Sequence, residues 1–217
     1  MYKYNRQFFN KIDSEEKAYW AGFIAADGNI RKDFLKMRIE LNIQDYSHLE
    51  KFRKSIQGEN PIVESIRPKN HSCYIDVNCK DFCLALNNLG ITPKKSLTLK
   101  IDFSLIPKEL RNHFIRGYFD GDGSINKYLR EGKNYYEWEI SFISSKDFLN
   151  QILEELNKKR NFYSCGNNFR MCFKAKQDIE DIINYLYKNA TIYMDRKMEK
   201  ANEFKALNDY QGATINS

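Results

Sequence analysis

The chain has 217 residues, of which 42% are hydrophobic and 14% aromatic, so it can bury a core and is too apolar for a disordered protein. It has no apolar run of about 20 residues and no signal peptide, which argues against a membrane or secreted protein and for the cytoplasm, or the organelle matrix if it is organelle-encoded. Five cysteines without a CxxC pair and three scattered histidines argue against zinc sites and disulfide frameworks. The net charge of +6 suits a polyanionic partner but identifies none by itself.

The first elements along the chain are a helix and a strand. Asp13 and Glu16 have the spacing of a capping box, and Gly28 is suited to a left-handed cap, so a helix is predicted over residues 14–27. After the glycine the hydrophobic period changes to two over residues 37–44, which predicts a strand. Further periodic segments predict a helix at 46–56, strands at 61–67 and 73–78, and a helix at 80–89.

The same order of elements then returns. Pro107 stands where a first helical residue is expected, and Gly123 follows the predicted helix at 107–121. Alternation around Trp138 and Phe142 predicts a strand. The remaining segments predict a helix at 146–158, strands at 162–165 and 169–175, and a helix at 177–188.

Each half therefore reads as αββαββα with antiparallel strands, and we predict an α+β fold with internal pseudo-two-fold symmetry. The halves are predicted as residues 1–104 and 105–217 of one compact body. Aligning the halves on their second helices puts Phe142 at the position of Asn42, so the alternation does not match there and a bulge or a shifted register is expected.

The most specific signal is a repeated motif. Residues 20–28 read W-A-G-F-I-A-A-D-G and residues 115–123 read I-R-G-Y-F-D-G-D-G, and both fit G-[FY]-[IF]-x-[AG]-D-G. Small residues four positions apart form a stripe on each helix, which lets two such helices cross with their backbones nearly in contact. Under pseudo-symmetry, Asp27 and Asp122 then arrive at the same end of the helix pair.

This placement of two carboxylates is electrostatically unfavourable. Each lies at the negative end of a helix dipole. Two carboxylates about 4–6 Å apart repel by some 3–4 kcal/mol at an effective dielectric near 20. Aspartate repeated at such a position therefore predicts a divalent cation site, and oxygen ligands suit Mg²⁺.

The repeated motifs resemble those of the LAGLIDADG homing endonucleases in their single-chain, double-motif form. The resemblance extends to L-G-I-T-P-K-K-S at 89–96 and A-T-I-Y-M-D-R-K at 190–197. It implies a saddle of two antiparallel sheets that binds in the DNA major groove, with the motif helices at the central interface.

The resemblance also implies roles for individual residues. Asp27 and Asp122 match the metal-binding position, and the backbone carbonyls of Ala26 and Gly121 would assist. Lys95 and Lys197 would lie near the scissile phosphates and stabilise charge there. The earlier acidic position of the motif is Asp120 in the second copy but Ala25 in the first, which makes the halves chemically unequal.

Two further sets of residues are predicted from strand positions. Residues at strand ends near the site could position water, or could simply cap the next helix: Gln44, Asp45, Ser144 and Ser145. Polar residues on the sheet faces are the candidates for DNA contact, although a polar face is normal for any antiparallel sheet. They are Arg38, Glu40, Asn42, Arg67, Lys69, Tyr74, Asp76, Asn126, Tyr128, Glu139, Arg170 and Lys174.

The predicted function is a sequence-specific double-strand DNA endonuclease, encoded within a mobile intron, that uses Mg²⁺ or in its place Mn²⁺. Its expected partner is double-stranded DNA with a long target site, and a monomer is expected because both halves are in one chain. Two alternatives stay open: an intron RNA maturase, with intron RNA as partner, and a DNA-binding regulator that has lost cleavage. Because neither end shows splicing-domain sequence, we do not expect an intein-embedded copy.

Overall fold

The computed structural model describes residues 2–68, 70–130, 132 and 136–213. The strands of this part form two four-stranded antiparallel sheets, in the order β1-β2-β4-β3 and β5-β6-β8-β7. The first half contains α1 (Glu15–Asp27), β1 (Gly28–Ile30), β2 (Met37–Asn42), α2 (Tyr46–Ser55), β3 (Ile62–Arg67), β4 (Asn70–Val77) and α3 (Lys80–Asn88). The second half contains α4 (Arg111–Asp122), β5 (Ser124–Leu129), β6 (Tyr136–Ser144), α5 (Lys146–Leu156), β7 (Tyr163–Cys165), β8 (Asn168–Phe173), α6 (Lys176–Tyr187) and α7 (Asp195–Ala213).

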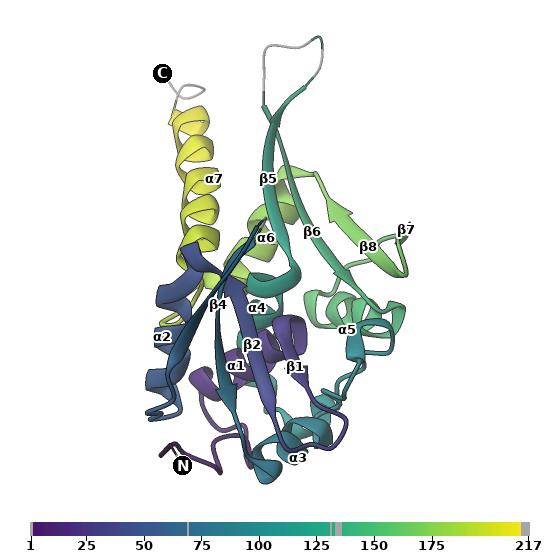
Figure 1. Ribbon diagram of the computed structural model, residues 1–217. Helices are drawn as coiled ribbons and strands as arrows, with labels where there is room; N and C mark the ends of the chain where they lie inside the picture. The colour runs from purple at the N-terminus through teal and green to yellow at the C-terminus, as the bar shows by residue number, and fades with distance from the viewer. Residues whose placement is uncertain (1, 69, 131, 133–135, 214–217) are drawn as a thin grey trace.

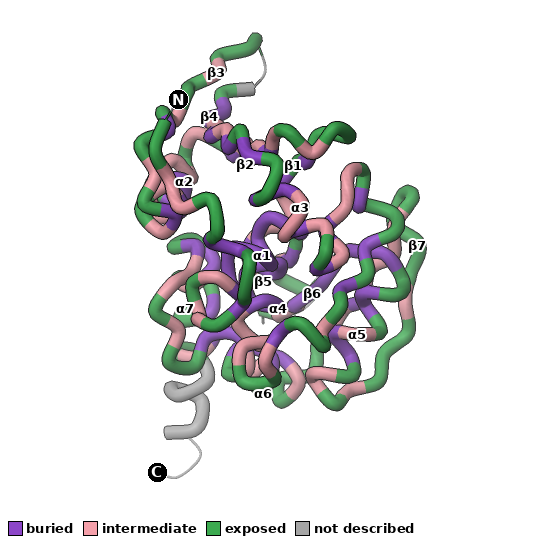
Figure 2. Tube along the Cα trace, turned by 90° about the horizontal axis from the view of Figure 1, so that it is seen from below, coloured by how far each residue is buried: buried purple, intermediate pink, exposed green. Residues whose placement is uncertain are grey.

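The motif helices α1 and α4 lie side by side at the centre of the molecule (Figure 1). Every residue from Ala18 to Ala25 of α1 is buried, so this helix has no polar face, unlike the amphipathic helices around it. Figure 2 shows this concentration of buried residues along the central helix. The pseudo-two-fold α+β fold predicted from the sequence is thus confirmed, while the boundary at residue 104 stays a prediction.

The sheets follow the predicted alternation. In β2, Met37, Ile39 and Leu41 are buried, and the residues between them face outward. In β6 the buried pair Ile140 and Phe142 takes the same role. Each sheet therefore has one apolar face on the core and one polar face.

The mismatch at Phe142 arises in the connection between the strand and the second helix. Asn29 pairs with Arg38, nine residues further along, whereas Ser124 pairs with Ser141, seventeen residues further along. The hairpin of β5 and β6 is therefore eight residues longer, an even number that keeps the alternation, and Phe142 corresponds to Ile39. The first half then adds the 3₁₀ turn Ile43–Asp45 before α2, so an alignment on the second helices places Phe142 beside Asn42 instead. In this register both halves keep their apolar face on the core, and no bulge is needed.

Two predicted helix starts differ from the structure. The N-cap of α1 is Ser14, whose hydroxyl accepts from the amide of Lys17, while Asp13 forms an ion pair with the Lys17 ammonium at 2.7 Å. Pro107 precedes a 3₁₀ turn, and α4 begins only at Arg111.

The glycines after the motif helices are not left-handed caps. Gly28 has φ −74° and Gly123 has φ −80°, both extended, because the chain passes directly from each helix into a strand. A side chain there is excluded by space instead, since a Cβ would overlap Ile24 in the first half and the ring of Phe119 in the second.

The helix α7 was not predicted. It packs beside β5, with the rings of Phe204 and Trp138 5.5 Å apart and an ion pair of 2.8 Å between Glu203 and Lys127 (Figure 1). Ala201 and Phe204 in the helix, and Met194 directly before it, are buried and spaced at helical intervals, so the signal was present but was masked by the many charged residues around it.

Candidate active site

The motif helices cross with their backbones in contact. A Cβ on Gly22 would overlap the carbonyl oxygen of Phe114, and a Cβ on Gly117 would overlap that of Tyr19. These two contacts are related by the pseudo-two-fold symmetry, since each glycine of one motif meets the same position of the other helix. The close crossing predicted from the small-residue stripes is thus what the structure contains.

This crossing brings the two motif aspartates together. Asp27 is the last residue of α1 and Asp122 the last residue of α4. The Asp27 Oδ2 atom lies 3.0 Å from the point at which a Cβ on Gly121 would stand, so its carboxylate sits against the end of α4. Among the residues that the structure describes, neither carboxylate forms an ion pair. Two acidic groups therefore share one end of the helix pair without a neutralising partner.

Their environment favours the protonated form. Burial, together with the charge of Asp122, raises the pKa of Asp27 to about 7, against the opposing attraction of Lys95 and other nearby cations. Burial likewise raises the pKa of Asp122, although its side chain is open to solvent and is therefore the better screened of the two. A bound cation would stabilise the ionised form of both carboxylates, which burial and mutual repulsion disfavour.

Two buried lysines lie beside the aspartates. Lys95 is 7% exposed and donates to the carbonyl oxygen of Gly28, and Lys197 is 5% exposed and donates to that of Gly123. These carbonyls belong to the residues that directly follow Asp27 and Asp122. Each lysine is thus fixed to the end of one motif helix.

Burial lowers the pKa of both lysines to about 8. For Lys95 the attraction of Asp122 and Asp27 partly offsets this effect. For Lys197 the charge of Arg196 adds to it, and Asp120, Asp27 and Asp122 oppose it. Both ammonium groups therefore still carry most of their charge at neutral pH, although they are buried beside the two aspartates.

The donor set fits a hard divalent cation that is shared with a substrate. Among the described residues no group of three or more His, Cys, Asp or Glu side chains could hold a metal. The two carboxylates alone would not complete a metal site, so further oxygen ligands are needed. Ala26 and Gly121 lie in the last turns of their helices, where backbone carbonyls lack intrahelical partners and are free to act as such ligands. Mg²⁺ is commonly held by one or two carboxylates plus substrate phosphates.

Asp120 serves a role that the sequence did not reveal. It is fully buried and accepts hydrogen bonds from the hydroxyls of Tyr19 at 2.8 Å and Tyr187 at 2.5 Å and from the amide of Met194 at 2.8 Å. It therefore ties both motif helices to the segment that carries Lys197. Burial raises its pKa, and these hydrogen bonds oppose the rise.

A second buried group holds the same segment. The Arg116 guanidinium is fully buried, donates to the backbone oxygens of Leu186 and Ile192, and pairs with Glu15 at 2.7 Å. Glu15 in turn accepts from the amide of Thr191. The only hint in the sequence was that Arg116 and Asp120 stand at otherwise apolar positions of the motif helix.

Three of the four residues predicted to position water are engaged within the fold. Ser145 caps α5 by accepting from the amide of Phe148 and donates to the carbonyl of Leu99. Ser144 is buried, and its hydroxyl oxygen lies 2.9 Å from that of Tyr118. Asp45 pairs with Arg196 at 3.1 Å.

Gln44 remains the most available of these four residues. It is exposed, and its backbone amide is capped by the side chain of Asn42. Water positioning by this group stays a prediction.

The predicted DNA-contact residues of the first half lie on one face of one sheet. Arg38 is directly opposite Asp76, and Glu40 is opposite Tyr74, all on the polar face. Arg38 donates two hydrogen bonds to Asp76, at 2.7 and 2.9 Å, and stacks on the Tyr74 ring at 3.7 Å. These side chains are thus pre-ordered by one another. The register places Asn42 and Arg67 on the same face, and Lys69 lies outside the described residues.

The second sheet has a matching polar face. Asn126 is opposite Glu139, and Arg170 pairs with Glu139 at 2.5 Å. Lys174 lies 3.5 Å from Glu139 and over the Tyr128 ring at 5.6 Å. The predicted set therefore gathers into one network on this face.

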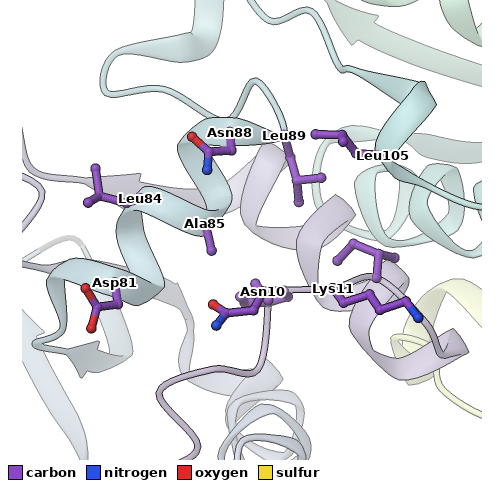
Figure 3. A pocket seen from close by; sticks show the side chains of 10 residues that line it. Asn10, Lys11, Asp81, Leu84, Ala85, Asn88, Leu89 and Leu105 are labelled. Atoms are coloured by element: carbon purple, nitrogen blue, oxygen red, sulfur yellow. The ribbon is translucent and has the colours of Figure 1, made fainter.

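Hollows adjoin both aspartates. One of about 600 Å³ is lined by Asp27 together with polar and charged residues of β1, β2 and their connection. Another of about 230 Å³ is lined by Asp122 and Tyr118, among others. A separate pocket of about 630 Å³ lies between the N-terminal segment and α3 and includes none of the candidate site residues (Figure 3).

Comparison with known proteins agrees with the geometry. Residues 109–169 match the model of a LAGLIDADG-like domain, and residues 16–80 match that of the WhiA LAGLIDADG-like domain. A stretch of 159 residues, 70% of this chain, is 28% identical to the replication factor C small subunit of Methanocaldococcus jannaschii, but it covers only 9% of that protein. None of the described helices is long and apolar enough to cross a membrane.

Solved structures share the fold at low sequence identity. The LAGLIDADG homing endonuclease I-GzeII in complex with its DNA target is 15% identical with a TM-score of 0.63, over 91% of each chain. I-LtrWI bound to target DNA is 13% identical with a TM-score of 0.63, over 96% of this chain and 92% of that one. With two LAGLIDADG-like matches that together span more than half of its residues, and with this architecture, the chain belongs to the LAGLIDADG family in its single-chain, double-motif form.

Proposed function

We propose that this protein is a sequence-specific endonuclease that hydrolyses both strands of a long DNA target with a divalent cation, Mg²⁺ or Mn²⁺. The observation that carries this proposal is the pair of unneutralised carboxylates, Asp27 and Asp122, at adjoining helix ends. A protein that only bound DNA would gain nothing from such a pair, because it opposes both helix dipoles and because burial, together with the charge of Asp122, raises the pKa of Asp27 to about 7.

The surroundings of the pair support phosphodiester chemistry. A divalent cation bound there supplies an activated water and neutralises charge on the phosphate. Asp27 and Asp122 would hold it, with the carbonyls of Ala26 and Gly121. Lys95 and Lys197, fixed by the carbonyls that follow each aspartate, would place an ammonium near each scissile phosphate and stabilise its charge.

The sheet faces support a sequence-specific substrate. Each polar face combines arginine with carboxylates and aromatic hydroxyls, and such mixtures can read base edges, whereas lysine alone mainly holds phosphates. Solved relatives with this fold carry DNA targets. Arg38 and Arg170, each held by a carboxylate, are the residues we assign first to base contacts.

Metal-dependent cleavage tests the proposal. A target site is first selected from a randomised DNA library. A plasmid that carries this site is then incubated with the protein in Mg²⁺, Mn²⁺, Ca²⁺ or EDTA. We expect linear product in Mg²⁺ and Mn²⁺ and binding without efficient cutting in Ca²⁺, whose coordination is looser. Full cleavage in excess EDTA would refute the metal site.

A second candidate is a DNA-binding regulator without nuclease activity. The observation that favours it is the match of the first half to a family model named for WhiA rather than for an endonuclease. It predicts tight binding to a specific site with no strand cut in Mg²⁺ or Mn²⁺. The same incubation therefore separates the two functions.

A further inference from the structure

The two halves differ most next to Asp122, where the structure contains a cavity of about 230 Å³. It is bounded by Ala25 and Ala26 of α1, by Ser96 and Leu99 of the segment that follows Lys95, and by Tyr118, Asp122, Ile143 and Asn168. Such a volume holds several water molecules, each of which takes roughly 30 Å³ in the liquid. The lining provides a phenol, a hydroxyl, an amide and a carboxylate as partners.

One of these partners lacks a hydrogen bond within the protein. The Asn168 Oδ1 atom is buried and, among the described residues, has no donor. An orphaned polar atom beside a polar cavity indicates bound water, because burying it unpaired is costly. The Tyr118 hydroxyl donates to Ile143 at 2.8 Å and also contacts Ser144, which places it in the wall of the cavity beside Asp122.

The other half cannot form the same cavity. The motif copies are 95 residues apart, so Tyr118 corresponds to Phe23, which has no hydroxyl, and Ala25 corresponds to Asp120. Where Ala25 leaves space, Asp120 is packed against Tyr19, Tyr187 and the amide of Met194. The polar space beside Asp122 is thus replaced by a closed hydrogen-bond network.

We propose that the cavity holds ordered water that serves the Asp122 half-site alone, and that Tyr118 is the positioning residue, whose hydroxyl oxygen accepts a hydrogen bond from this water and orients it beside Asp122. The half-site of Asp27 opens instead into the charged hollow along β1 and β2. We therefore expect the two DNA strands to be cut at unequal rates. This inference rests on the proposed nuclease function.

The test measures each strand separately. A duplex target with a different fluorophore on each 5′ end is cut under single-turnover conditions by the wild type, by Tyr118→Phe and by Tyr185→Phe. Tyr185 is a partly buried phenol that does not line the cavity, so its variant controls for the loss of a buried hydroxyl. A crystal structure of the metal-free wild type and of Tyr118→Phe gives a second readout that is independent of activity.

We expect Tyr118→Phe to slow one strand about tenfold, the effect of losing one hydrogen bond near a charged group, and to leave the other strand within about twofold. Duplex nicked in a single strand should then accumulate, and the crystals should show water bonded to Asn168 and Tyr118 that is displaced in the variant. Equal slowing of both strands, an unchanged strand ratio or a dry cavity would overturn the inference. A wild type that cuts neither strand refutes the proposed function instead. The crystal structures then still show whether the cavity holds ordered water.

Discussion

Three aspartates of the motif helices have raised pKa values, yet their surroundings give them different roles. Asp120 is saturated by two phenols and an amide, so it has no capacity for a ligand. Asp27 and Asp122 have no ion-pair partner among the described residues, and they face hollows on either side of the helix pair. Hydrogen-bond saturation, more than burial, separates the structural carboxylate from the two proposed for catalysis.

Replacing Asp27 with asparagine should stabilise the metal-free protein at pH 7. The folded pKa of Asp27, about 7, lies above the roughly 3.9 of an unfolded aspartate, so the folded state binds more protons and loses stability as pH rises between these values. Asp27→Asn removes this loss, and we expect a gain of about 1–3 kcal/mol at pH 7, after allowance for partial exposure, that vanishes toward pH 4. Thermal melts at several pH values measure it.

The matched control is Asp147→Asn, since Asp147 is exposed in the first turn of α5, where the helix dipole favours a negative charge. This change should be neutral or slightly destabilising at pH 7. If Asp27→Asn melts below the wild type at pH 7, the strained carboxylate pair does not exist.

The pH dependence of cleavage should be narrow. In the free protein Asp27 must lose its proton, with a pKa of about 7, and the lysines must keep theirs, with a pKa of about 8. Because kcat/KM reports ionisations of the free enzyme, it should rise through about pH 7 and fall above about pH 8. Excess Mg²⁺ should shift only the rise in kcat/KM on the acidic side of the profile, and should shift it toward lower pH.

Lysine substitutions check the alkaline limb. Lys95→Met should slow cleavage about 10²-fold, the usual effect of removing one group that stabilises transition-state charge, and should weaken the fall above pH 8. Lys94→Met, at the neighbouring exposed position, is the control and should retain the fall in kcat/KM above about pH 8. An unchanged profile in Lys95→Met would remove this lysine from the mechanism.

At the scale of elements, the helix pair was the part most open to prediction from sequence. Glycine at positions 22 and 117 and the paired Asp-Gly ends repeat in register, and the symmetry of this repeat is enough to predict which helix faces meet. Long-range partners could not be predicted in the same way. The network around Asp120 joins segments more than 70 residues apart, and the 3₁₀ turn before α2 displaced the alignment of the two halves.

The crossing should not tolerate a single added methyl group. In Gly117→Ala the new Cβ would overlap the backbone oxygen of Tyr19, so α1 and α4 must separate. We expect a loss of at least about 3 kcal/mol, the upper range for overpacking, and loss of cleavage because Asp27 and Asp122 move apart. Chemical denaturation measures the first effect and a plasmid assay the second.

Gly132→Ala provides the comparison for this substitution. Among the described residues, no atom lies within 4 Å of a Cβ at that position, and its φ of +70° limits the cost to about 1–2 kcal/mol of backbone strain. Equal destabilisation by the two variants would contradict the close crossing.

For the whole molecule, the single chain supplies both sheets and both aspartates, so a monomer should bind a complete DNA site. With a net charge of +6 and basic residues on both sheet faces, binding should weaken with salt in a log–log slope of roughly −4 to −8. Fluorescence anisotropy gives the slope, and analytical ultracentrifugation gives the mass. An obligate dimer, or a slope near zero on the selected site, would contradict this arrangement.

Selection of cleaved sites from a randomised double-stranded DNA library is the most direct test of the nuclease itself. The wild type and the double variant Asp27→Asn, Asp122→Asn are compared in Mg²⁺, with EDTA as the blank. We expect the wild type to enrich one long sequence cut in both strands, while the double variant binds that sequence without cutting it. A wild type that enriches no cut sequence, or a double variant that cuts the same one, would contradict a metal-dependent nuclease built on this pair of aspartates.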